Sequence, residues 1–165
     1  MPTRVVSNKD KFFAGAKTTE ERDEERRQAD EARKREHEIR RTELMGEARK
    51  VVSEVMASAE AALRGRVELS RDTVGSRTLR VPTTGAEFRC DFFTTDGELN
   101  VKADGTRGGT DRVVYNPTSD KLALASGGGR NLLASEHAKA TSGQSVDLED
   151  LLYGLLHQWR EDHKL

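Results

Sequence analysis

The sequence has few of the features that mark a secreted, membrane-bound or disulfide-linked protein. It holds a single cysteine, Cys90, so no disulfide can form within the chain, which is typical of a reducing compartment. No apolar run approaches the roughly 20 residues of a membrane-spanning helix. The first residues lack the apolar region of a secretory signal. These absences predict a cytoplasmic protein without a membrane partner.

Apolar residues and an excess charge of one sign are also scarce. Hydrophobic residues make up 34% of the chain, aromatic residues 5% and charged residues 35%. This composition predicts a modest core. The formal net charge is −1, and no region is strongly basic. A weak overall charge argues against a partner that requires many phosphate contacts.

Signatures of catalysis and of metal binding are missing as well. The histidines stand at positions 37, 137, 157 and 163, and none has a second ligand at a metal-binding spacing. The segment that begins at His37 lacks the second histidine of a zinc protease motif, and neither G-x-S-x-G nor a Walker loop is present. We therefore expect no catalytic residue, no metal site and no cofactor, and we expect that the protein is not an enzyme.

What the sequence does contain is an unusually charged segment, Glu21 to Arg41. Its acids and bases alternate at a helical step, and Thr18 with Glu21 has the spacing of a capping box. Each acid lies four residues before a base, the favourable orientation in a helix: Asp23 and Arg27, Asp30 and Lys34, Glu31 and Arg35, Glu36 and Arg40. The segment predicts a solvent-exposed helix that does not join the core.

The same helix becomes apolar from Leu44 onward. Apolar residues at 45, 48, 52, 55, 59 and 62 follow a spacing of three and four, and Gly65 provides a stop. We therefore predict one helix from Thr19 to Arg64. Its apolar face suits two arrangements, which are packing against the chain's own sheet or a coiled coil with a second copy.

Residues 67–125 alternate between apolar and polar side chains, as strands do. Cys90 shares the apolar face of its strand with Phe88 and Phe92, which predicts a buried, inert thiol. Asp96-Gly97 and Asn116-Pro117 mark tight turns between neighbouring strands. The predicted strands are Val67–Ser70, Arg77–Val81, Glu87–Phe93, Glu98–Ala103, Arg112–Tyr115 and Lys121–Ala125. Short turns between successive strands predict an antiparallel meander of five or six strands.

The C-terminal segment predicts a short helix at Leu132–Ala140 and then a strongly amphipathic helix. Ser145 or Asp147 caps this second helix, which runs to about Asp162. Its apolar stripe consists of Leu148, Leu151, Leu152, Leu155, Leu156 and Trp159. The stripe suits a core helix that lies on the sheet, and Trp159 also suits an anchor for a partner.

Together these patterns predict an α+β fold in which a long charged N-terminal helix precedes an antiparallel meander and a C-terminal amphipathic helix packed on the sheet. The predicted organisation is a flexible tail at residues 1–17, a charged exposed helix at 18–43 and a compact α+β domain at 44–165.

The first functional hypothesis is a non-enzymatic interaction protein of adaptor, assembly or inhibitor type, of the kind that phages and other mobile elements encode. Phe12 and Phe13 are adjacent aromatic residues in a polar tail, where they suit binding to a protein partner. We predict that these two residues, the helix arginines and Trp159 form the binding surface; the arginines are Arg26, Arg27, Arg33 and Arg35. A homodimer is compatible with the same features.

The alternative hypothesis is a regulator that binds nucleic acid or nucleoprotein. The arginines of the charged helix are clustered, although acids interleave them. Strand alternation also places Arg80, Arg89 and Lys102 on the polar face of the sheet, where they form a basic strip if the strands bring them side by side. Glu87 and Asp91 share that face.

Overall fold

A computed structural model describes residues 7–16, 18–70, 76–93, 98–103, 111–125 and 145–165 of the chain. The predicted helix at Leu132–Ala140 and the Asp96-Gly97 turn lie outside these residues. The chain forms two compact units, Met1–Ile39 and Arg40–Leu165.

The N-terminal unit contains a short helix that the sequence analysis did not predict. Helix α1 spans Asn8–Ala14, and the Ser7 side chain caps it by accepting a hydrogen bond from the Asp10 backbone N–H at 3.2 Å. None of its residues is buried. Seven residues are too few to show a periodic pattern, so only the cap at Ser7 could have indicated the helix.

Helix α2 spans Thr19–Ala62, close to the predicted Thr19–Arg64. The predicted capping box is confirmed: Thr18 Oγ1 accepts from the Glu21 N–H at 3.1 Å, and the Thr18 N–H donates to Glu21 Oε2 at 3.2 Å. Gly65 has a φ of 73°, the left-handed conformation expected just beyond the helix end. Local capping chemistry thus sets both ends of the helix.

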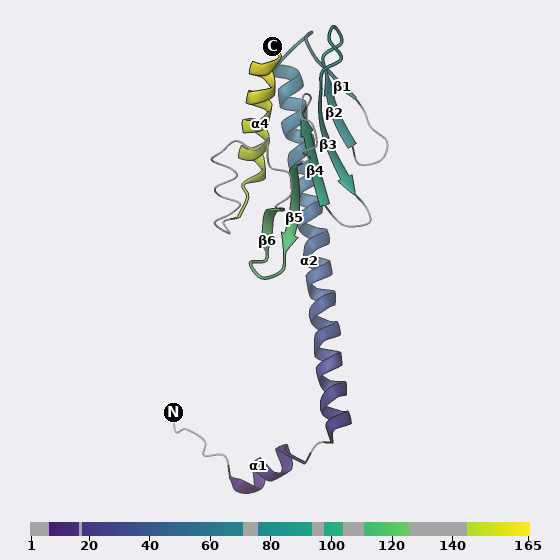
Figure 1. The fold of residues 1–165 in the computed structure, drawn as a ribbon, viewed down its shortest axis with the longest axis vertical. Helices are drawn as coiled ribbons and strands as arrows, with labels where there is room; N and C mark the ends of the chain where they lie inside the picture. The colour runs from purple at the N-terminus through teal and green to yellow at the C-terminus, as the bar shows by residue number, and fades with distance from the viewer. Residues whose placement is uncertain (1–6, 17, 71–75, 94–97, 104–110, 126–144) are drawn as a thin grey trace. The chain divides into compact units, whose positions relative to one another are not determined.

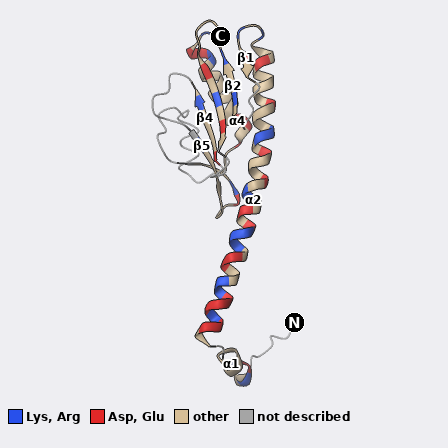
Figure 2. Ribbon diagram, turned by 90° about the vertical axis from the view of Figure 1, so that its right-hand side faces the viewer, with Lys and Arg blue, Asp and Glu red and all other residues tan. Residues whose placement is uncertain are grey.

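The first half of α2 carries interleaved acidic and basic residues, which Figure 2 marks in red and blue along the ribbon. Two arginines form ion pairs with acids three residues away in the sequence, whereas the predicted spacing was four residues. Arg27 pairs with Glu24 at 2.7 Å, and Arg40 pairs with Glu43 at 3.5 Å. Both spacings place side chains on one helix face, and exposed pairs of this kind contribute little to stability.

Six strands form one antiparallel sheet in sequence order, which confirms the predicted meander (Figure 1). The strands are β1 (Glu68–Ser70), β2 (Ser76–Arg80), β3 (Glu87–Phe93), β4 (Glu98–Ala103), β5 (Asp111–Asn116) and β6 (Lys121–Ala125). Cys90 lies opposite Val101, and Leu99 lies opposite both Phe92 and Val113. This register gathers the apolar side chains on one face of the sheet.

The second half of α2 and helix α4 (Leu148–Asp162) cover that apolar face (Figure 1). Asp147 caps α4, and its side chain accepts from the Asp150 N–H at 3.3 Å. The α2 residues in the core are Met45, Ala48, Val52, Val55, Met56, Ala59 and Leu63. The apolar stripe of α2 therefore packs on the chain's own sheet. A coiled coil through this face would have to expose the core.

The β5–β6 hairpin contacts α2 through Asp120. Its carboxylate accepts a hydrogen bond from the Tyr115 hydroxyl at 2.7 Å and pairs with Arg40 at 3.3 Å. The hydrogen bond to Asp120 raises the pKa of Tyr115, and the Asp120 charge raises the pKa of Arg40. These contacts lie where the exposed part of α2 gives way to its buried part. No helix among the described residues has the length and apolar character needed to cross a membrane.

Candidate functional site

Helix α1 displays two of the four exposed large apolar side chains among the described residues. Phe12 is 71% exposed and Phe13 is 61% exposed. Their rings meet edge to face, with centroids 5.5 Å apart. Phe88 and Phe92, by contrast, lie in the core. The predicted aromatic pair is thus displayed together on one short helix, where it forms a compact apolar surface.

The four predicted binding arginines lie in the charged part of α2, and all four are exposed. Arg26 and Arg33 share a face, because seven residues make about two helical turns. Arg35 follows Arg26 by nine residues, which places it on about the opposite side of the helix. Arg27 is paired with Glu24. The helix therefore spreads these cations around its circumference instead of gathering them into one basic patch.

Trp159 lies in the core. It is 1% exposed, and its ring lies 6.0 Å from that of Phe88 and 5.7 Å from that of His163, centroid to centroid. The last helix suited either a core helix or a partner-binding helix, and the burial of Trp159 agrees with the core helix. The folded surface does not offer the Trp159 ring to a partner, and this differs from its predicted role as an anchor.

The polar face of the sheet does not carry a continuous basic strip. Arg89 lies directly opposite Lys102, as the hypothesis required, but it also hydrogen-bonds to Asp91 at 2.7 Å. Arg80 lies opposite Glu68 on one side and Glu87 on the other. Farther along the same face, Arg112 pairs with Glu98 at 3.6 Å. Acidic side chains therefore separate the cations, so the face has mixed charge.

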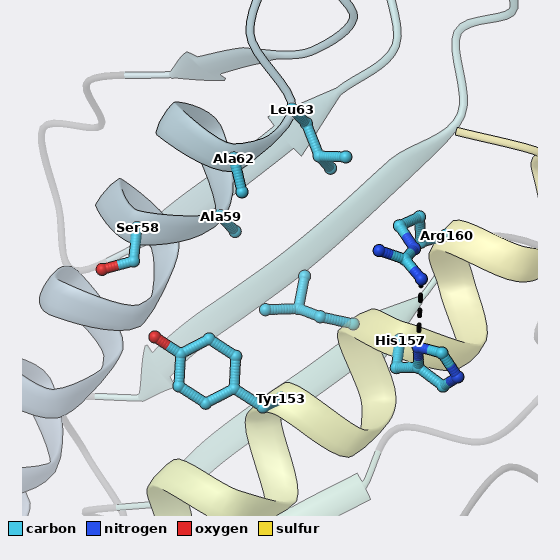
Figure 3. A pocket seen from close by; sticks show the side chains of 8 residues that line it. Ser58, Ala59, Ala62, Leu63, Tyr153, His157 and Arg160 are labelled. Atoms are coloured by element: carbon cyan, nitrogen blue, oxygen red, sulfur yellow. Dashed lines mark hydrogen bonds between the residues drawn. The ribbon is translucent and has the colours of Figure 1, made fainter.

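A groove that the sequence analysis missed lies between the last turns of α2 and helix α4 (Figure 3). It has a volume of about 240 Å³. Tyr153, 41% exposed, and Arg160 line the α4 side, and Ser58 and Ala62 line the α2 side. The two helices are far apart in sequence, so periodicity indicated each helix but not the hollow between them.

The thiol of Cys90 is buried in the core. Burial raises the pKa of the Cys90 thiol to about 12, and the nearby Asp91 charge acts in the same direction. A thiol in this state is a poor nucleophile at neutral pH. No cluster of three metal-binding side chains occurs among the residues that the structure describes.

Comparisons with protein-family models, with curated proteins and with solved structures found no match to this chain.

Proposed function

We propose that this chain is a non-enzymatic interaction protein that binds a protein partner through Phe12 and Phe13 on α1. The type of function is adaptor, assembly or inhibition, such as accessory proteins of phages and other mobile elements perform. The free thiol of Cys90 suits the reducing cytoplasm as the place of action.

The exposure of the aromatic pair is the observation that carries this proposal. Neither ring contributes to a core, because α1 has no buried residue. Covering a Phe side chain contributes about 1.5–3 kcal/mol relative to leaving it exposed. A partner with an apolar pocket could therefore gain several kcal/mol from two adjacent residues, before the cost of association is subtracted.

The charged part of α2 supports the proposal in a different way. Its mixed charges keep the segment next to α1 soluble without a core contact, and they provide polar side chains around an aromatic anchor. Arg26, Arg33 and Arg35 are exposed donors for acidic groups of the same partner. The arginines of α2 are spread around the helix, so they do not favour nucleic acid over protein as the partner. The test must therefore also be able to detect nucleic-acid binding.

The test is affinity capture from the native host with the tagged full chain, read by mass spectrometry. The double variant Phe12→Ala/Phe13→Ala should lose the partner and keep the thermal stability of the parent, because neither ring is buried. Ile39→Ala is the matched control. Ile39 is 61% exposed and lies in the same unit, and its loss should leave capture unchanged.

Each capture is run with and without nuclease and at two salt concentrations. Retention of the same partner by the double Phe variant would contradict the proposal. Recovery that collapses with nuclease and falls steeply with salt would instead indicate nucleic-acid binding. Capture of an untagged second copy of the chain would identify self-association.

A further inference from the structure

The groove between α2 and α4 has an apolar floor with polar groups at each end. Its lining consists of Ser58, Ala59, Ala62, Leu63, Tyr153, Leu156, His157 and Arg160. Figure 3 shows Ser58 and Tyr153 toward one end and His157 and Arg160 toward the other. The hollow exists because α2 presents short side chains, Ala59 and Ala62, where it faces the larger side chains of α4.

Arg160 places a cation at one end of the groove. Its Nη2 lies 3.5 Å from Nδ1 of His157 and 3.2 Å from Oε1 of Glu161. Both contacts use the same nitrogen, whereas a guanidinium carries five N–H groups. The N–H groups on Nε and Nη1 remain available, and each can donate a charge-assisted hydrogen bond to the carboxylate of a ligand.

The size of the groove indicates what fits it. A volume of about 240 Å³ is below the range of about 300–1,000 Å³ that drug-sized ligands occupy. It suits one large side chain of a protein partner. The exposed Tyr153 ring at the edge favours an aromatic side chain, because aromatic rings gain from edge-to-face or offset contact.

We propose that this groove is a second binding site, which takes an aromatic side chain of a protein partner that carries an aspartate or glutamate next to it. The aromatic ring packs on Ala59, Leu63 and Tyr153, and the neighbouring carboxylate pairs with Arg160. The groove residues belong to the second unit and α1 to the first, so this proposal does not rest on the proposed function.

The test uses three blocked tripeptides as probes, with amide chemical shifts of the full-length chain followed by NMR. The first probe has phenylalanine between two aspartates, the second has phenylalanine between two lysines, and the third has alanine between two aspartates. The first should bind at millimolar concentration and shift the amides of the groove residues. The second and third should bind more weakly or not at all, because each lacks one of the two required groups.

Two variants locate the binding. Ala62→Trp should abolish it, because Ala62 is exposed at the groove and a large side chain there fills the hollow. Arg160→Gln should weaken the aspartate probe by about two- to fivefold, the range expected for an exposed ion pair. Arg80→Gln, an exposed arginine on the opposite face of the sheet, is the matched control and should change nothing.

Equal binding of the lysine and aspartate probes would overturn the proposal, as would shifts located away from the groove. Full binding by a folded Ala62→Trp variant would overturn it too. Should that variant fail to fold, the comparison of Arg160→Gln with Arg80→Gln and the choice among the three probes still decide the outcome.

Discussion

Cys90 shows how burial determines the chemistry of one residue. Its side chain is fully buried on the apolar face of the sheet, opposite Val101, and Asp91 follows it in the strand. Burial in an apolar environment disfavours the thiolate, and the neighbouring negative charge disfavours it further. The pKa therefore rises from 9.0 to about 12. The residue contributes to the core, and its reactivity is suppressed.

The raised pKa of Cys90 predicts a loss of stability at alkaline pH. Above pH 9.0 the unfolded chain releases the thiol proton, while the folded protein keeps it up to about pH 12. The contribution of the protonated Cys90 thiol to the free energy of unfolding is fully present below pH 9.0 and is lost as the pH rises from 9.0 to about 12. The slope is at most about 1.4 kcal/mol per pH unit. Unfolding by guanidinium chloride at pH 8 and at pH 10.5 measures this loss of stability. Cys90→Ala should lose less stability than the parent between these values, and an equal loss would contradict the prediction.

At the scale of the element, helix α2 and the turn that follows it each hold a glycine, and the two glycines are in opposite situations. Gly46 lies within the helix, and a Cβ added there would meet nothing within 4 Å. Gly65 lies beyond the helix end with a φ of 73°, which side chains rarely tolerate. The first glycine weakens the helix, whereas the second allows the chain to leave it.

The same substitution should therefore have opposite effects at these two positions. Gly46→Ala should raise the free energy of unfolding by about 0.5–1 kcal/mol, because alanine loses less backbone entropy in a helix. Gly65→Ala should lower it by about 1–2 kcal/mol, the cost of the left-handed conformation for a residue with a Cβ. Chemical denaturation of the two variants and the parent measures both changes. If both substitutions changed the free energy of unfolding in the same direction, the role assigned to one of the glycines would be wrong.

At the scale of the whole molecule, the core lies entirely in the second unit. All buried side chains among the described residues come from Met45 or later in the sequence. The three parts of the core are the second half of α2, the sheet and α4. The first unit, Met1–Ile39, contributes exposed side chains instead.

A chain that starts at Arg40 should therefore fold as the full chain does. It retains the pairing of Arg40 with Asp120, and it loses no core contact. Its thermal unfolding should stay cooperative with the same midpoint, while the helical signal in circular dichroism falls with the loss of α1 and half of α2. Calorimetry and circular dichroism measure these quantities. A clearly lower midpoint would mean that the first unit stabilises the second.

Sequence reasoning predicted the elements better than the candidate site. Strands β3, β4 and β6 have the predicted bounds, because alternation and turn residues act over a few positions. Trp159 and Arg89 show where such reasoning stops. The stripe of α4 suited both a core helix and an interface, and a cation on a polar strand face did not reveal its partner Asp91. Helix α1 was missed because a helix of seven residues has no period to detect.

The sequence by itself determined where the main helices and strands begin and end. Thr18, Gly65 and Asp147 act on backbone groups within a few residues, so their effects can be read locally. The tertiary structure decided what meets across the fold: the Trp159 ring beside Phe88, the acids between the sheet's cations, and the groove between α2 and α4. These features depend on residues that are distant in sequence, and only the packing of helices on the sheet brings them together.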